Sequence, residues 1–149
     1  MMPRITVQLL VVAGALLASR GESFAHCQIP CGIYNDHHRV FSMREDLTTI
    51  SKSAKLIRKL SRKNDPQSKN QLVRWVVNKE QHAERIIRTI SDYFMAQKIK
   101  PKAKGYREML VRHHAVMVAA MKCKQSAEQK PLQALGRAIA GIAGYWPKK

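Results

Sequence analysis

Residues 40–57 read VFSMREDLTTISKSAKLI. Apolar side chains recur in this stretch at alternating spacings of three and four residues, which places them on one face of an α-helix. These side chains are Val40, Met43, Leu47, Ile50, Ala54 and Ile57. A helix with a single apolar stripe needs another surface to cover it, so we expect this helix to pack against others.

The ends of this helix can also be predicted. Asn35 or Asp36 is suited to cap its first turn, because a short polar side chain accepts hydrogen bonds from the free backbone N–H groups there. Asn64, Asp65 and Pro66 end the helix, since turn residues and proline oppose its continuation. A second break is expected at Lys100-Pro101.

Three more amphipathic helices are predicted, over about 68–95, over about 105–124 and from Pro131 onward, where proline suits the first turn. No alternating strand pattern occurs after residue 25. With short links between the helices, residues 36–146 predict an all-α fold, an antiparallel four-helix bundle. The apolar positions are Leu72, Val76, Ala83, Ile86, Ile90 and Phe94 in the second helix, Tyr106, Met109, His113, Val116, Ala120 and Cys123 in the third, and Leu132, Leu135, Ile139, Ile142 and Tyr145 in the fourth.

Residues 1–25 have the pattern of a cleaved signal peptide. Arg4 precedes an apolar run over 5–18, and Ser23 and Ala25 are small residues at the −3 and −1 positions of a cleavage site. The apolar run is short for a bilayer span, although an uncleaved anchor is the alternative. We therefore expect a secretory route, extracellular or periplasmic, with an organelle such as a plastid as the alternative, and no stable membrane span after processing.

Cleavage after Ala25 would make residues 26–149 the mature chain, with His26 as its N-terminus. The α-amine, the backbone nitrogen of Cys27 and the Cys27 thiolate could then close two fused chelate rings on one metal ion. Cys31 offers a second thiolate, and Pro30 favours the turn that returns it. The His26 imidazole could reach an axial position, so residues 26–34 form a candidate metal hook.

This donor set indicates the kind of metal. Two nitrogens and two thiolates near one plane favour nickel or copper over zinc, which prefers a tetrahedron. A disulfide between Cys27 and Cys31 is the alternative to a metal site. Cys123 lies on the apolar stripe of the third helix and is expected to be a buried, unreactive thiol. His113 lies on the same stripe and is expected to be a hydrogen-bonded core histidine, whereas His37 and His38 are expected at the solvated start of the first helix.

Residues 26–34, HCQIPCGIY, resemble the nickel superoxide dismutase family, whose signature is His-Cys-X-X-Pro-Cys-Gly-X-Tyr at a processed N-terminus. Weaker similarity occurs in the second helix, in KEQHAE at 79–84 and SDYF at 91–94. The resemblance implies one nickel ion per subunit, held by His26, Cys27 and Cys31, with Tyr34 over the open face to position the anion. It also implies disproportionation of superoxide to oxygen and hydrogen peroxide by Ni(II)/Ni(III) cycling, in a homo-oligomer, a hexamer.

The chain differs from the better-known bacterial members at three places. Gln28 stands where they carry aspartate, and His82 stands where they carry arginine. They also hold the axial imidazole with a glutamate early in the first helix, whereas residues 40–43 of this chain contain no carboxylate.

The 149-residue chain has 27 basic and ten acidic residues, a formal net charge of +17. Such a charge attracts anions, and it could steer superoxide to the metal or bind polyanions without specificity. No aromatic interleaving or recognition motif accompanies the lysines, so we expect no specific nucleic-acid partner. Two other functions stay open at this point: a secreted cationic helical protein that binds anionic surfaces, and a metal carrier that uses the same hook without turnover.

Overall fold

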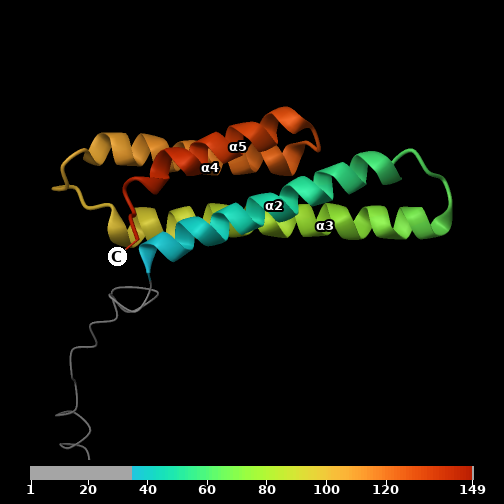
Figure 1. The fold of residues 1–149 in the computed structure, drawn as a ribbon, viewed down its shortest axis with the longest axis horizontal. Coiled ribbons are helices and arrows are strands. Elements are labelled where there is room, and N and C mark those ends of the chain that lie inside the picture. The colour runs from blue at the N-terminus through green and yellow to red at the C-terminus, as the bar shows by residue number, and fades with distance from the viewer. Residues whose placement is uncertain (1–34, 149) are drawn as a thin grey trace, which may run out of the picture.

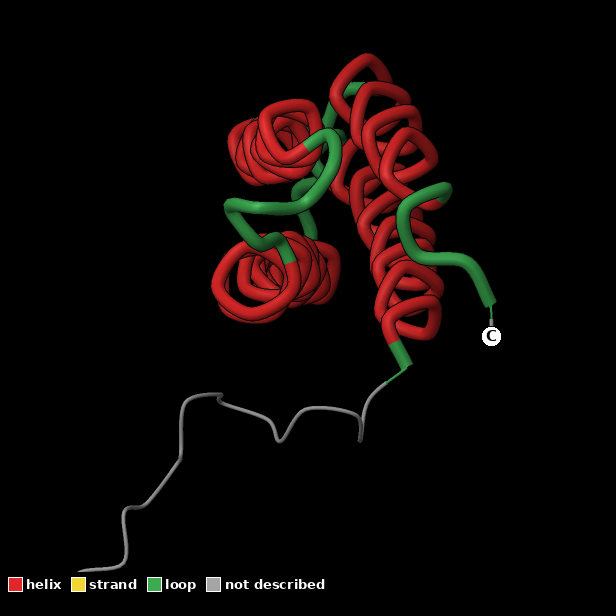
Figure 2. The backbone as a smooth tube through the Cα atoms, turned by 90° about the vertical axis from the view of Figure 1, so that its left-hand side faces the viewer, coloured by secondary structure: helices red, strands yellow, loops and turns green. Residues whose placement is uncertain are grey.

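The computed structural model describes residues 35–148, and everything below concerns these residues (Figure 1). All of their regular secondary structure is helical, as Figure 2 shows from the end of the molecule where the first helix begins. The elements are α2 (Asp36–Leu60), α3 (Pro66–Arg88), a π-helix η1 (Thr89–Lys98) that continues α3, α4 (Tyr106–Gln125) and α5 (Gln129–Ala143).

The helices form a bundle in which successive helices run in opposite directions (Figure 1). Helix α2 packs against α3 and α5, and α4 packs against the same two helices. The predicted all-α fold with four packed helices is therefore confirmed. No helix in the described part of the chain is both long and apolar enough to cross a bilayer.

Local sequence signals determine where the helices begin. Asn35 is the N-cap of α2, and Asp65 is the N-cap of α3, where its carboxylate accepts a hydrogen bond from the Ser68 backbone N–H over 2.8 Å. Pro66 occupies the first turn of α3, where its missing N–H costs nothing. Gly105 precedes α4 with φ of 77°, a left-handed conformation that glycine adopts without strain.

The core consists of most of the predicted apolar stripes. Burying one such side chain contributes about 1.5–3 kcal/mol before conformational entropy is subtracted, so a shared core explains why the four helices are stable only together. Leu47, Tyr106 and Tyr145 lie half-buried at its edge. The largest fully buried side chains include Met43, Ile50, Ile86, Ile90, Phe94, Leu135, Ile139 and Ile142.

The prediction that Val76 lies on the inner face of α3 is wrong, because this side chain is 38% exposed. Helices α2 and α3 extend beyond the turn between α4 and α5, as Figure 1 shows. Lys79, three residues after Val76, contacts the last turn of α4. The first half of α3 therefore has α2 as a neighbour but no α4 beside it, and Val73 and Val77 are exposed there as well.

The predicted α-helix over 68–95 also differs from the structure at its end. The chain changes to a π-helix at Thr89 and stays helical to Lys98. The Ile99 backbone N–H donates to the Phe94 carbonyl oxygen over 2.9 Å, a bond across five residues. This wider turn accompanies the burial of two adjacent aromatic side chains, Tyr93 and Phe94, in the core.

Candidate metal centre

The predicted site residues His26, Cys27, Cys31 and Tyr34 lie outside the described residues. The structure describes the segment that follows Tyr34 directly, from Asn35 into the first turn of α2. Three side chains of this segment are held by other parts of the bundle or by the helix itself. They form what we call the hook base, which consists of Asn35, Asp36 and His37.

Asn35 joins the hook base to the backbone of α2. Its backbone is extended, with φ of −80° and ψ of 117°, and its Oδ1 accepts hydrogen bonds from the backbone N–H groups of His37, at 2.9 Å, and His38, at 3.4 Å. Two N–H groups that the helix leaves free are satisfied in this way. The predicted cap at Asn35 is confirmed.

Asp36 joins the hook base to η1. Its Oδ1 accepts a hydrogen bond from the Tyr93 hydroxyl over 2.5 Å and lies 3.0 Å from the Lys98 Nζ. Burial, and then the hydrogen bond to Asp36, raise the pKa of the Tyr93 phenol. Tyr93 therefore stays a hydrogen-bond donor at neutral pH, and Lys98 balances the charge of the Asp36 carboxylate.

His37 joins the hook base to the C-terminal segment. Its Nδ1 lies 3.2 Å from the backbone carbonyl oxygen of Trp146, so this nitrogen carries the proton and donates it. We expected both histidines at the start of α2 to be solvated. His38 is exposed, but His37 is half-buried and makes this tertiary contact.

The KEQHAE segment at 79–84 joins α3 to the end of α4. Lys79 is 4% exposed, and its Nζ lies 2.6 Å from the carbonyl oxygens of both Cys123 and Lys124. Glu84 is 2.9 Å from the Lys124 Nζ. A cation at a helix C-terminus is favourable because free carbonyl groups point toward it.

His82, which stands where bacterial members of the resembled family carry arginine, has a carboxylate partner that sequence reasoning missed. Its Nδ1 lies 2.6 Å from Oδ1 of Asp46, which is 8% exposed and also 3.2 Å from the Arg85 Nε. Asp46 lies three residues after Met43 and four before Ile50, on the buried face of α2. A carboxylate on the apolar face of a helix indicates a buried charge, and a buried charge requires a polar or charged partner, so this position could have predicted one.

Within residues 35–148, no group of three or more His, Cys, Asp and Glu side chains is placed to hold a metal ion. Cys123 is a free thiol with no exposed surface, and burial raises its pKa to about 11 although Lys79 opposes the shift. The predicted burial of Cys123 and the predicted buried, hydrogen-bonded state of His113 are both confirmed. That the Cys123 thiol is unreactive stays a prediction.

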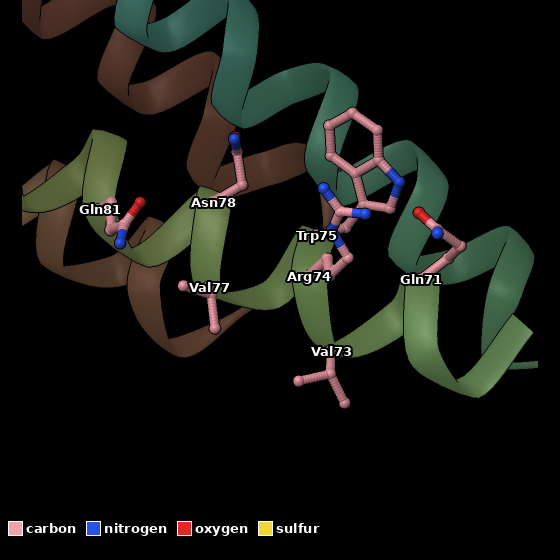
Figure 3. A pocket seen from close by; sticks show the side chains of 7 residues that line it. All are labelled: Gln71, Val73, Arg74, Trp75, Val77, Asn78 and Gln81. Atoms are coloured by element: carbon pink, nitrogen blue, oxygen red, sulfur yellow. The ribbon is translucent and has the colours of Figure 1, made fainter. Parts of the chain in front are cut away.

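The projecting half of α3 carries an open hollow of about 380 Å³, shown in Figure 3. Two contacts join the lining of this hollow to α2. Ser53 Oγ donates a hydrogen bond to Asn78 Oδ1 over 3.1 Å, and the Lys52 Nζ lies over the ring of Trp75. The residues that line the hollow include no thiol, imidazole or carboxylate, the side chains that bind nickel and other transition metals most strongly. The residues that line it are Gln71, Val73, Arg74, Trp75, Val77, Asn78 and Gln81.

Comparison with known proteins identifies the family. The family model of nickel-containing superoxide dismutase matches residues 21–149, which include the HCQIPCGIY hook and the whole bundle. No curated protein and no solved structure matches the chain.

Proposed function

Since the chain belongs to the nickel-containing superoxide dismutase family, we propose that residues 26–34 are its metal site. The family is an enzyme family, so the chain is a nickel-dependent superoxide dismutase that converts superoxide to oxygen and hydrogen peroxide. The observation that supports the site is that the family match includes all nine residues of the signature.

The proposed ligands are His26, through its α-amine and imidazole, Cys27, through its backbone nitrogen and thiolate, and Cys31, through its thiolate. Two thiolates and two nitrogens are a donor set that suits nickel. Bound nickel supplies the one-electron redox chemistry that superoxide disproportionation requires. Tyr34 is proposed to position the superoxide anion through its hydroxyl.

We propose that the hook base sets the position from which these ligands extend. Cys31 and Asn35 are four positions apart in the sequence, a span of about 14 Å at most. Asp36 is bound by η1 and His37 by the C-terminal segment, so two different parts of the bundle hold the start of α2. A fixed starting point reduces the conformational entropy that the hook loses when it closes on a metal ion.

Cleavage after Ala25 is proposed to create the α-amine ligand. In a longer chain, the nitrogen of His26 belongs to an amide, which is a far poorer donor than a primary amine. The apolar run over 5–18 and the small residues at 23 and 25 support this processing and a secretory route, with an organelle as the alternative.

Assembly into a hexamer is proposed from the family resemblance. Valines exposed on two helices supply apolar surface for contacts between subunits: Val73 is 63% exposed and Val111 is 69% exposed. The excess of basic residues, among them the exposed Lys100, Lys102 and Lys104 of the loop before α4, is proposed to attract the superoxide anion.

The test compares two forms of the protein. One begins at His26, and the other keeps a single Met before His26. We expect the first to bind one nickel ion per subunit and to turn over superoxide, and the second to be equally helical by circular dichroism but nearly inactive. Equal activity of the two forms would show that the α-amine is not a ligand. Nickel binding without turnover in the first form would favour a metal carrier.

A further inference from the structure

His113 and Trp146 form a hydrogen-bonded pair inside the bundle. The His113 side chain has no exposed surface, and Trp146 is 9% exposed. The Trp146 indole Nε1–H donates to Nε2 of His113 over 3.0 Å. Because an indole can only donate, Nε2 must be the acceptor and the ring proton must be on Nδ1, which donates to the Met109 carbonyl oxygen over 2.7 Å. The pair therefore requires a neutral imidazole.

The surroundings of the His113 ring are aromatic. The ring centroid lies 5.5 Å from that of Phe94, 5.8 Å from that of the Trp146 ring and 6.1 Å from that of Tyr145. Burial lowers the pKa of His113, and the hydrogen bond to Met109 opposes this shift. An imidazolium in this place would have to lose its solvation.

His37 of α2 contacts the Trp146 carbonyl oxygen through Nδ1, and the other ionisable groups named here have other partners or face solvent. On α4, Arg112 is paired with Glu108, and His114 is exposed. On η1, Tyr93 and Lys98 contact Asp36 of α2. In the C-terminal segment, Tyr145 is a phenol, which is uncharged in acid, and Lys148 is exposed. Within residues 35–148, the partners of the two His113 ring nitrogens are the Met109 carbonyl oxygen and the Trp146 indole, and neither is a carboxylate.

Trp146 also connects this pair to the start of α2. Its indole packs on Phe94, with ring centroids 4.8 Å apart, and its backbone carbonyl oxygen accepts the hydrogen bond from His37. One residue thus contacts η1, α4 and the hook base. If its indole leaves the core, the His37 contact is expected to break with it.

We propose that Trp146 is an acid-sensitive latch, which closes while His113 is neutral and opens when His113 takes up a proton at Nε2. Protonation converts Nε2 from an acceptor to a donor, so it faces the donor Nε1–H of the indole. Two buried donors that face each other are unfavourable. This arrangement ends when the indole moves out of the core and water solvates the imidazolium. The latch itself is independent of the metal, and only its consequence for the nickel hook, through His37, rests on the proposed function.

The test follows Trp146 fluorescence between pH 7.5 and pH 4 in a Trp75→Phe background, where Trp146 is the single tryptophan. We expect the emission to shift to longer wavelength as the pH falls, while the helical signal at 222 nm is retained. If opening is linked to the uptake of one proton, the ratio of open to closed molecules rises about tenfold for each unit by which the pH falls below the start of the transition. A shift that coincides with loss of helix, or no shift down to pH 4, would overturn the proposal.

Two variants provide the comparison. His114→Gln removes the exposed neighbouring histidine and should leave the transition unchanged. His113→Gln, which cannot take up a proton, should abolish it, and a transition that persists in this variant would overturn the latch. If His113→Gln does not fold, nuclear magnetic resonance of the Trp75→Phe protein decides: the Trp146 indole N–H and the His113 ring C–H must titrate with one midpoint, and two different midpoints would refute the coupling.

Discussion

The buried ammonium group of Lys79 donates a hydrogen bond to the carbonyl oxygen of Cys123 over 2.6 Å and so ties the middle of α3 to the last turn of α4. The same Nζ contacts the Lys124 carbonyl oxygen and lies 2.9 Å from Glu80. This contact marks where the α4–α5 pair ends beside the longer α2–α3 pair.

Replacing Lys79 by Met should destabilise the bundle. Methionine has a similar length, but it leaves the carbonyl groups of Cys123 and Lys124 without their donor. The loss of these charge-assisted bonds, partly offset by the removal of a buried charge, is expected to cost about 1–2 kcal/mol of unfolding free energy. Urea unfolding measures it. Lys55→Met, at an exposed position of α2, is the control and should change stability by no more than about 0.5 kcal/mol.

The two hook cysteines should be essential for nickel. Cys27→Ser or Cys31→Ser removes one proposed thiolate ligand, so we expect loss of both bound nickel and superoxide turnover with an unchanged helical spectrum. His26→Gln should keep nickel and slow turnover, because the α-amine and both thiolates remain. Metal analysis and an activity assay measure these effects, and full activity in either serine variant would disprove the ligand set.

Cys123 should behave differently from the hook cysteines. Its thiol has no exposed surface, and burial raises its pKa to about 11, so little thiolate exists at neutral pH. We expect no reaction of Cys123 with a thiol reagent at pH 7.5 in the folded protein and full reaction in denaturant. Peptide mapping after labelling identifies the modified residue, and labelling of Cys123 without denaturant would contradict the buried core.

The stability of the protein should fall in acid because of His113. Its pKa is lowered in the folded state, so the unfolded chain takes up the proton first as the pH falls below about 6.5. The stability that His113 contributes is present above this value and decreases, by at most about 1.4 kcal/mol per pH unit, until the folded-state pKa is reached. Urea unfolding at several pH values checks this slope. His113→Gln should show a shallower slope, and identical slopes would contradict the assignment.

Assembly should depend on salt. Each subunit carries a formal charge of roughly +16 once residues 1–25, with Arg4, Arg20 and Glu22, are removed. Subunits with such a charge repel one another at low ionic strength, whereas at 0.3 M salt the repulsion is largely screened beyond about 6 Å. We expect light scattering to show a larger assembly at 0.3 M salt than at 0.02 M salt. A monomer at both concentrations would argue against the proposed hexamer.

The sequence by itself determined the helices and the identity of the family. Caps and breaks such as Asn35, Asp65 and Pro66 act within a few residues, so their effect can be predicted without knowing the fold. The stripe from Val40 to Ile57 follows from helix periodicity in the same way. The HCQIPCGIY signature is likewise local, because its proposed donors lie within six consecutive residues, His26 to Cys31.

Tertiary structure alone decided which partner each buried polar group contacts. The exposure of Val76 and the burial of Lys79 depend on where α4 ends beside α3, which is a matter of unequal helix lengths. Asp46 contacts His82, which is 36 residues away in the sequence, and His37 contacts Trp146, which is 109 residues away. Local periodicity carries no information about such distances, because these contacts exist only after the helices have packed around a common core.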